Sequence, residues 1–353
     1  MSRTPLLYVL HSGNLYGTER MALATAEGLV DDFDPVILAP PGPALAEAAR
    51  IGLKAQPFSS TLELARLIRP AFADSRQLAV IATGVAHSLC AIALNQVYRR
   101  RLAHLHVVHG GTDERLSYGR KRLLNRSAAL LVAVSGFVKE RLIANGAREK
   151  KIHVIENFLP EARVAGCPRR GAFSVDGVKK ILVISRIDPI KRVDLLLSAM
   201  DREALLNKLE VRVLGTGWEL ENLRARAAQT HPNVTFAGFT SQVEAQLAGS
   251  DLLAHMCPAE PFGLAILEAI AAKVPVIVPD RGGAGSLVEE SVSGFHFRAD
   301  DAASLSKKLL EIGRLPAAEL NRIAANAWSL LGTRFSPASR IRDYRSLLER
   351  GLA

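Results

Sequence analysis

The sequence predicts an α/β protein built from two doubly wound parallel-sheet domains. Short apolar runs alternate with helix-like stretches along the chain, which is the pattern of repeated βαβ units. The length of 353 residues favours two domains over one continuous core. A segment containing Gly, Pro and Arg, residues 165–171, separates two series of such runs and suits an exposed linker.

Each expected strand is a short apolar run followed by a helix-like segment or a turn. In the first half the runs are residues 6–10, 36–39, 78–82, 105–108 and 130–134. In the second half they are residues 181–185, 211–214, 234–237, 251–254 and 274–279, with a helix expected over 265–272. From Ser336-Pro337 onward a final helix carries one apolar face, which another element must cover: Ile341, Tyr344, Leu347 and Leu348. These patterns place domains at 1–165 and 179–335, a linker at 166–178 and a terminal helix at 336–353.

One segment tests whether the chain crosses a membrane. Residues 77–98 contain no Asp, Glu, Lys or Arg and are long enough to span a bilayer. Thr83-Gly84 interrupts them, and Asn95 and Gln96 are unfavourable in lipid, so we expect a strand, a turn and a helix. The first apolar run is too short for a signal peptide, and Cys90, Cys167 and Cys257 form no metal-binding or disulfide pattern. We expect a cytoplasmic protein, with peripheral contact at the inner face of the membrane as an open alternative.

The net charge of +10 indicates contact with phosphate groups or anionic lipid. Much of the excess lies within residues 99–126, which contain Arg99, Arg100, Arg101, Arg115, Arg120, Lys121, Arg122 and Arg126. A lipid-linked or membrane-surface acceptor would explain this stretch, and a solvated basic face explains it equally well. Nucleic acid is a poor candidate, because only 5% of the residues are aromatic and we find no basic patch interleaved with stacking aromatic side chains.

In parallel sheets, ligands bind beyond the carboxyl ends of the strands, so the loops after the strands matter most. Arg186 and Lys191 follow the first strand of the second half, and two cations at a helix start favour an anion there as much as a solvated surface. Glu260 and Glu268 bracket a Pro-Phe-Gly helix entry, where the N–H groups of Phe262, Gly263 and Leu264 can hold phosphate or sugar hydroxyls. Gly282-Gly283, after the next strand, would allow close approach to a ligand.

The first half offers weaker signals. Residues 11–19 form a glycine-bearing loop that opens a helix, but they lack the GxGxxG pattern of dinucleotide sites. His109 ends an expected strand and can present an imidazole to a ligand. His104 and His106 alternate along that strand without metal-ligand partners, and we interpret them as structural.

These residues together resemble the family-four retaining glycosyltransferases of the GT-B fold. The most specific element is E-x7-E, from Glu260 to Glu268. It is accompanied by Ile184-Ser185-Arg186 with Lys191, by Leu214-Gly215-Thr216-Gly217 and by Phe236-Ala237-Gly238-Phe239. The N-terminal landmarks are less specific: Gly17-Thr18-Glu19, His109-Gly110, and Val132-Ala133-Val134-Ser135 with Ile155-Glu156-Asn157. The resemblance implies two Rossmann-like domains facing across a cleft, an acceptor-binding N-terminal and a nucleotide-sugar-binding C-terminal domain, with the last helix packing back on the first.

The resemblance also implies roles for individual residues. Arg186 and Lys191 would hold the donor diphosphate, and Glu268 the ribose hydroxyls. Glu260, with the N–H groups of Phe262 and Gly263, would hold the transferred sugar, and His109 would lie near its reacting face. The remaining donor-binding positions would be Gly13, Gly17, Gly238, Pro261 and Leu264, and the acceptor-binding positions Tyr16, Thr18, Arg120 and Lys121. No metal and no other cofactor are expected, because Arg, Lys and helix N–H groups can stabilise the leaving diphosphate.

The implied function is retaining, metal-independent transfer of a hexose-type sugar from a nucleoside-diphosphate sugar to a glycan or lipid-linked acceptor, in cell-surface polysaccharide or glycolipid synthesis. A non-catalytic sugar-nucleotide-binding protein and a sugar-nucleotide epimerase of related architecture remain alternatives. The family's usual glutamate after the glycine pair is Ser286 here, and Asn14-Leu15-Tyr16 stands where a second glycine is common. The identity of the donor therefore does not transfer with the resemblance.

Overall fold

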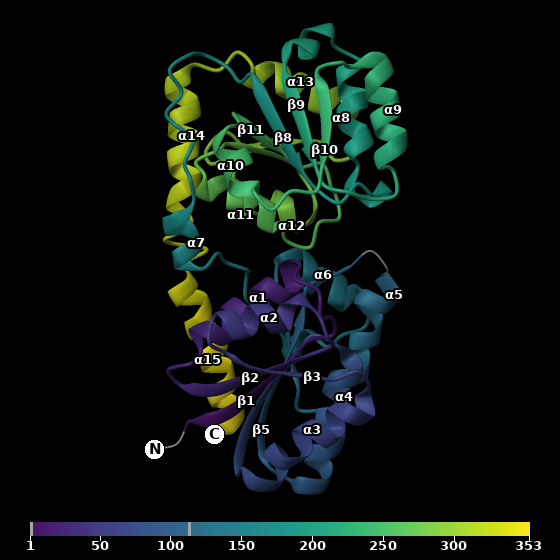
Figure 1. The fold of residues 1–353 in the computed structure, drawn as a ribbon, viewed down its shortest axis with the longest axis vertical. Helices are drawn as coiled ribbons and strands as arrows, with labels where there is room; N and C mark the ends of the chain where they lie inside the picture. Colours follow the sequence, from purple (N-terminus) through teal and green to yellow (C-terminus); the bar gives the residue numbers. More distant parts are fainter. Residues whose placement is uncertain (1–2, 112–113) are drawn as a thin grey trace. The chain divides into compact units, whose positions relative to one another are not determined.

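The computed structural model describes residues 3–111 and 114–353, and the chain divides into two compact units (Figure 1). Unit 1 comprises Met1–Phe158 together with Pro337–Ala353, and unit 2 comprises Leu159–Ser336. Each unit is built around one parallel sheet with helices on both of its faces. The predicted pair of doubly wound parallel-sheet domains is confirmed.

Unit 1 contains a seven-stranded parallel sheet of order β3-β2-β1-β4-β5-β6-β7. Its strands are β1 (Thr4–Val9), β2 (Phe33–Ala39), β3 (Lys54–Pro57), β4 (Gln77–Ala82), β5 (Arg101–Val108), β6 (Leu130–Ala133) and β7 (Ile152–Val154). The central strands are almost continuously buried, because helices cover both faces. The sequence did not predict the edge strands β3 and β7, which are short and lack an apolar run.

The helices of unit 1 connect these strands as crossovers. They are α1 (Gly17–Gly28), α2 (Pro43–Arg50), α3 (Thr61–Asp74), α4 (Val85–Tyr98), α5 (Glu114–Ser117) and α6 (Gly136–Ala144), with a 3₁₀ helix over Gly119–Arg126. Ser60 and Ser135 cap α3 and α6 by accepting from the N–H groups of Glu63 and Val138. The uncharged segment 77–98 forms β4 and α4, as predicted. Over the described residues, the helices are all too short or too polar to cross a membrane.

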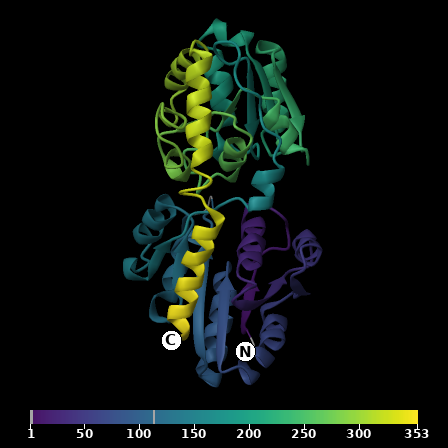
Figure 2. The ribbon, with the colours of Figure 1, turned by 90° about the vertical axis from the view of Figure 1, so that its left-hand side faces the viewer.

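The C-terminal helix α15 (Pro337–Leu352) belongs to unit 1 and packs on β5 (Figure 2). Its predicted apolar face is buried, and Leu348 has no exposed surface. Gly28 of α1 leaves room for Ile341, since a Cβ on Gly28 would lie 2.6 Å from that side chain. The return of the last helix to the first domain is confirmed.

Unit 2 contains a six-stranded parallel sheet of order β10-β9-β8-β11-β12-β13. Its strands are β8 (Lys180–Ile184), β9 (Glu210–Leu214), β10 (Val234–Gly238), β11 (Leu252–Ala254), β12 (Val276–Pro279) and β13 (Phe295–Phe297). Its helices are α7 (Glu161–Gly166), α8 (Val193–Met200), α9 (Leu220–Thr230), α10 (Val243–Ala248), α11 (Leu264–Ala271), α12 (Gly282–Gly285), α13 (Ala302–Ile312) and α14 (Ala317–Ser329). Strand β13, with His296 between two phenylalanines, was not predicted.

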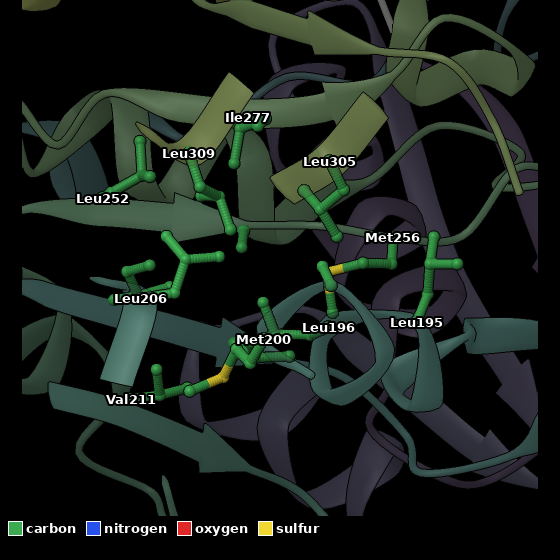
Figure 3. Packing of buried hydrophobic residues seen from close by; sticks show 14 of the residues in the cluster. Leu195, Leu196, Met200, Leu206, Val211, Leu252, Met256, Ile277, Leu305 and Leu309 are labelled. Carbon is green, nitrogen blue, oxygen red and sulfur yellow. The ribbon is translucent and has the colours of Figure 1, made fainter. Parts of the chain in front are cut away.

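The core of unit 2 fixes the strands whose ends carry the site. Leu196 and Met200 of α8 and Leu305 and Leu309 of α13 pack with strand residues such as Ile277 (Figure 3). All five of these side chains are almost fully buried. This close-packed layer makes a rigid support for the loops at the carboxyl ends of the strands.

Residues 166–178 are exposed at most positions, as expected of a linker, but some of them pack into unit 2. Phe173 and Val178 are buried in unit 2, and Cys167 is buried too. The guanidinium of Arg170 pairs with Asp251 at 2.6 Å and lies over the Phe173 ring. The polar and basic residues of this segment therefore make specific contacts on the surface of unit 2.

Candidate active site

The strand order of unit 2 brings two loops together. From β8 the chain winds outward through β9 and β10, and it then returns to β11 on the other side of β8. The loops after β8 and β11 therefore diverge at a topological switch point, where open parallel sheets bind their ligands. Lys191 follows β8 and Glu260 follows β11, so the topology itself explains why these two residues meet.

Lys191 and Glu260 form a buried ion pair. The Nζ of Lys191 lies 2.6 Å from the Oε2 of Glu260, with 17% and 14% of the two side chains exposed. Burial raises the pKa of Glu260, but His255 and the Lys191 ammonium outweigh it and hold this pKa well below its ordinary value. Burial likewise lowers the pKa of Lys191, and the Glu260 carboxylate more than offsets that and leaves this pKa raised. Both side chains are therefore charged at neutral pH.

Two further side chains of the same loop surround Glu260. The Nε2 of His255 lies 3.3 Å from the Oε2 of Glu260. Cys257 is almost fully buried, and burial raises the pKa of its thiol to about 11. Neither residue belongs to a recognisable sequence motif, so no role was expected for either.

Three glycines hold the Glu260 loop in place. Gly263 is the N-cap residue of α11 and has a φ of +103°, a left-handed conformation that favours glycine. A Cβ on Gly282 or Gly283 would lie 2.7 or 2.1 Å from a carbonyl oxygen of residues 258–261, and the N–H of Gly283 donates to the Glu260 carbonyl. The Gly282-Gly283 pair lets the Glu260 loop pack closely, and the expected approach of a ligand to the same pair stays a prediction.

Glu268 has a different partner from Glu260. It lies within α11, whereas Glu260 precedes the helix, so the two carboxylates are not stacked on successive turns of one helix. Arg163 of α7 contacts Glu268 at 3.1 Å and Glu244 at 2.5 Å. Arg163 was missed in the sequence, since it is distant along the chain from both carboxylates.

The other predicted donor residues take varied positions. Arg186 has 64% of its side chain exposed and lies 3.2 Å from Asp188. Phe262 is buried and packs edge-on against Phe335, while Pro261 and Leu264 are half-buried at the start of α11. Gly238 ends β10 with a φ of +73°, and its carbonyl accepts from the N–H of Gly215.

Two exposed aromatic side chains follow β9 and β10. Trp218 is 89% exposed and Phe239 is 78% exposed, beside Gly217 and Gly238. Large exposed aromatic faces at the carboxyl ends of strands suit stacking on a planar ligand. The Gly215-Thr216-Gly217 segment before Trp218 was the available signal in the sequence.

In unit 1, four predicted residues line one cavity of about 420 Å³: Thr18, His109, Arg120 and Lys121. His11 and His87 line it as well, together with the first residues of α4. Burial and the charge of Arg120 lower the pKa of Lys121 to about 8. The cavity thus combines two basic side chains with a helix N-terminus, which is an arrangement that attracts anions.

His109 is uncharged at neutral pH in this cavity. Burial, with a small contribution from His11, lowers its pKa to about 3. Its Nε2 is buried and, within residues 3–111 and 114–353, lacks a hydrogen-bond partner. His104 and His106 instead share the Ser88 hydroxyl at 3.1 and 2.9 Å, which is consistent with their structural interpretation.

Three other predicted residues of unit 1 do not line that cavity as the described residues define it. Gly13 packs against the backbone of Pro40, since a Cβ there would lie 2.3 Å from that carbonyl oxygen. Gly17 is the first residue of α1. Tyr16 is 68% exposed, and its N–H donates to the Glu19 carboxylate.

The fold and this site define a class of protein. Its members have two Rossmann-like units and carry cationic and carboxylate side chains at the topological switch point, where such sheets bind nucleotides. The family comparisons agree. Residues 169–328 match the model for glycosyl transferases group 1, and residues 16–163 match the model for glycosyltransferase family 4. The chain belongs to the group 1, family 4 glycosyltransferases.

Curated relatives are similar over part of their length. The GDP-mannose-dependent alpha-mannosyltransferase of Mycobacterium tuberculosis (strain CDC 1551 / Oshkosh) is 29% identical over 52% of this chain and 49% of that protein. The N-acetyl-alpha-D-glucosaminyl L-malate synthase of Bacillus anthracis is 24% identical over 67% of this chain and 65% of that protein. The chain thus spans about half to two thirds of the length of these relatives.

Solved structures share the fold along the full chain. A glycosyltransferase from Rickettsia africae has a TM-score of 0.81 at 21% identity and covers 100% of this chain and 99% of its own. HepE of Anabaena, solved in complex with UDP and glucose, has a TM-score of 0.79 at 20% identity. The match covers 98% of this chain and 99% of the HepE chain. At these identities the likeness shows the GT-B fold.

Proposed function

We propose that this protein is a retaining, metal-independent glycosyltransferase that moves a hexose-type sugar from a nucleoside-diphosphate sugar to a glycan or lipid-linked acceptor. The observation that carries the proposal is the buried Lys191–Glu260 pair at the switch point of unit 2. A fixed ammonium beside an ionised carboxylate suits a ligand that joins a diphosphate to a sugar. Family membership supports the reaction class.

The donor residues keep enough free capacity to bind substrate. The Lys191 ammonium has three N–H donors, so it can hold Glu260 and still donate to a phosphate oxygen. Arg186, exposed beside it, can take the other phosphate oxygens in a forked contact. Charge develops on the diphosphate as the sugar leaves, and these two cations with the N-terminus of α11 would stabilise it.

The two carboxylates would recognise the sugar and the ribose. Glu260 stays ionised and so accepts hydrogen bonds from sugar hydroxyls instead of giving up a proton. Glu268 would accept from the ribose hydroxyls while Arg163 fixes its orientation. Trp218 and Phe239 offer faces on which the base can stack. His109, neutral at physiological pH, would contact the transferred sugar as a hydrogen-bond partner.

The cavity of unit 1 favours an acceptor with an anionic group. Arg120, Lys121 and the N-terminus of α4 would bind a phosphate or diphosphate such as lipid-linked acceptors carry. One relative is named D-inositol 3-phosphate glycosyltransferase and another phosphatidyl-myo-inositol mannosyltransferase. The same basic residues would support peripheral contact with anionic membrane from the cytoplasm, at about 1 kcal/mol for each Lys or Arg near the surface.

A substitution at Glu260 tests the donor assignment. Glu260→Gln keeps the shape but weakens the acceptor for sugar hydroxyls, so turnover should fall by roughly 100-fold or more. The affinity for the nucleoside diphosphate, measured by calorimetry, should stay within about threefold, because the diphosphate contacts remain. The control is Glu221→Gln, an exposed carboxylate of α9. A large loss of diphosphate affinity in Glu260→Gln would contradict the assigned role.

A second pair of variants tests the acceptor cavity. Arg120→Ser combined with Lys121→Ser should raise KM for a lipid-linked acceptor at least tenfold and leave KM for the donor unchanged. Arg126→Ser removes a cation from the same basic stretch but outside the cavity, and it serves as the matched control. Equal effects of the double variant and the control would point to general electrostatic attraction.

A further inference from the structure

The loop that carries Glu260 brings together three different ligand types. His255, Cys257 and Glu260 each offer one ligand atom, and these atoms lie within 4.8 Å of one another. Imidazole, thiol and carboxylate are the groups that bind Zn²⁺ in proteins. The proposed transfer reaction uses only Glu260, so the other two residues need a separate explanation.

His255 and Cys257 face Glu260 from a buried position. The His255 side chain is 7% exposed, and its Nε2 has no well-formed hydrogen bond in the described part of the chain. The nearest charged group to this atom is the Glu260 carboxylate at 3.3 Å, so His255 and Glu260 already face each other as two ligands of one ion would. Cys257, 1% exposed, lies two residues further along the same loop.

We propose that His255, Cys257 and Glu260 form an inhibitory site for Zn²⁺. Binding would require two changes. The Cys257 thiol would release its proton to the buffer, and the Glu260 carboxylate would leave the Lys191 ammonium and bind the metal. The Lys191 side chain is long but only 17% exposed, so its ammonium must rotate away from Glu260 toward solvent, and this rearrangement opposes metal binding. Three protein ligands leave a fourth position for water, which keeps the ion exchangeable.

The loop is close to the required geometry. Tetrahedral zinc with ordinary bond lengths places ligand atoms about 3.3–3.8 Å apart. The His255 and Glu260 ligand atoms already lie 3.3 Å apart. Backbone hydrogen bonds from His255 to Ile277 and from Gly283 to Glu260 fix both ends of the loop. Small side-chain rotations are therefore enough to close the site.

Metal binding would block the donor sugar. Zinc would take one Glu260 oxygen and turn the carboxylate from its position beside Lys191, which weakens its hydrogen bonds to the sugar hydroxyls, so Zn²⁺ would compete with the donor. This consequence rests on the proposed function, whereas metal binding itself does not. The two are therefore tested separately.

Binding is tested with Co²⁺ as a spectroscopic probe on the full chain. We expect visible d–d bands and a near-ultraviolet thiolate-to-cobalt charge-transfer band. Cys257→Ser should abolish the charge-transfer band and weaken Co²⁺ binding by roughly a hundredfold. Cys90→Ser and Cys167→Ser are the matched controls and should retain both signals. No thiolate band in the wild type, or a band that survives Cys257→Ser, would overturn the proposal.

A substitution at Lys191 should strengthen Co²⁺ binding, whereas substitutions of the ligands should weaken it. Because its ammonium competes with the metal for Glu260, Lys191→Met should bind Co²⁺ several-fold more tightly than the wild type. Weaker binding in Lys191→Met would overturn the competition. His255→Gln, a second ligand variant, should weaken Co²⁺ binding and keeps the test valid if Cys257→Ser does not fold.

In activity assays, Zn²⁺ should raise KM for the donor, EDTA should restore it, and Cys257→Ser should resist Zn²⁺. Inhibition that persists fully in Cys257→Ser would overturn the inhibitory role. An enzyme without measurable turnover would contradict the proposed function, and the Co²⁺ spectra would still decide the metal site.

Discussion

Breaking the buried Lys191–Glu260 pair should destabilise unit 2 by a predictable amount. The two charged atoms are 2.6 Å apart and both side chains are more than four-fifths buried. Removal of one partner leaves a buried charge without compensation, which costs about 3–5 kcal/mol. In a unit of this size, each 1 kcal/mol shifts Tm by about 2–4 °C, so Lys191→Met or Glu260→Leu should lower Tm by roughly 6–20 °C.

The double variant is the informative one. With both charges gone, Lys191→Met with Glu260→Leu places apolar groups together, and its stability should exceed that of either single variant. The assay is thermal unfolding followed by tryptophan fluorescence. The chain's two tryptophans, Trp218 and Trp328, both lie in unit 2 and report on that unit.

An exposed pair of the same unit is the control for this cycle. Arg224 and Glu221 lie 2.9 Å apart on α9 with 46% and 76% of their side chains exposed. Replacing either should change stability by no more than about 1 kcal/mol. If the losses from Lys191→Met and Glu260→Leu simply added in the double variant, the two charges would not be coupled and the reasoning would be refuted.

Three other predictions concern stability at acid pH, the packing of the C-terminal helix and the binding of the nucleotide base. Burial lowers the pKa of His104 to about 4, so the folded state keeps it neutral while the unfolded state takes up a proton below about pH 6.5. The free energy of unfolding therefore decreases as the pH is lowered, and this group accounts for a loss of about 2 kcal/mol at pH 5. A free energy from urea unfolding, followed by far-ultraviolet circular dichroism, that does not change between pH 7 and pH 5 would contradict this. Leu348→Ala should cost about 2–5 kcal/mol in unit 1, because the side chain is fully buried against the sheet, and a loss well below 1 kcal/mol in the same assay would disprove that packing. Trp218→Ala should weaken nucleoside-diphosphate binding by about 1–3 kcal/mol in calorimetry if its ring stacks on the base, and unchanged affinity would remove that role.

The sequence predicted the strands that are buried on both faces. β1, β4 and β8 are apolar runs, and their burial follows from the helices on both sides of the sheet. The edge strands β3 and β13 were missed, because short and partly polar segments pair only once a neighbouring strand is present. Local pattern is therefore informative at the centre of each sheet and weak at the edges β3, β7 and β13, although it did predict the edge strand β10.

The site was predicted to a similar extent. Lys191 and Glu260 were selected from motif spacing, and the strand order explains why they meet. Their neighbours could not be predicted in this way. Arg163 reaches Glu268 from about a hundred residues away along the chain, and this long-range contact leaves no periodicity in the sequence.

Glycines show the same limit on prediction. Gly282 and Gly283 were expected to let a ligand approach, and in the structure they lie against the backbone that positions Glu260. A glycine marks a close approach in either case. Only the three-dimensional arrangement identifies which group is approached.

The most direct test of the proposed transferase is the release of nucleoside diphosphate from a panel of UDP-, GDP- and ADP-sugars. The assay contains EDTA and is run with and without crude membrane lipid. We expect turnover of one donor class, undiminished by EDTA and increased by lipid. No turnover with any donor, together with no rise in the Tm of unit 2 on addition of the nucleotides, would contradict the assignment of the donor site.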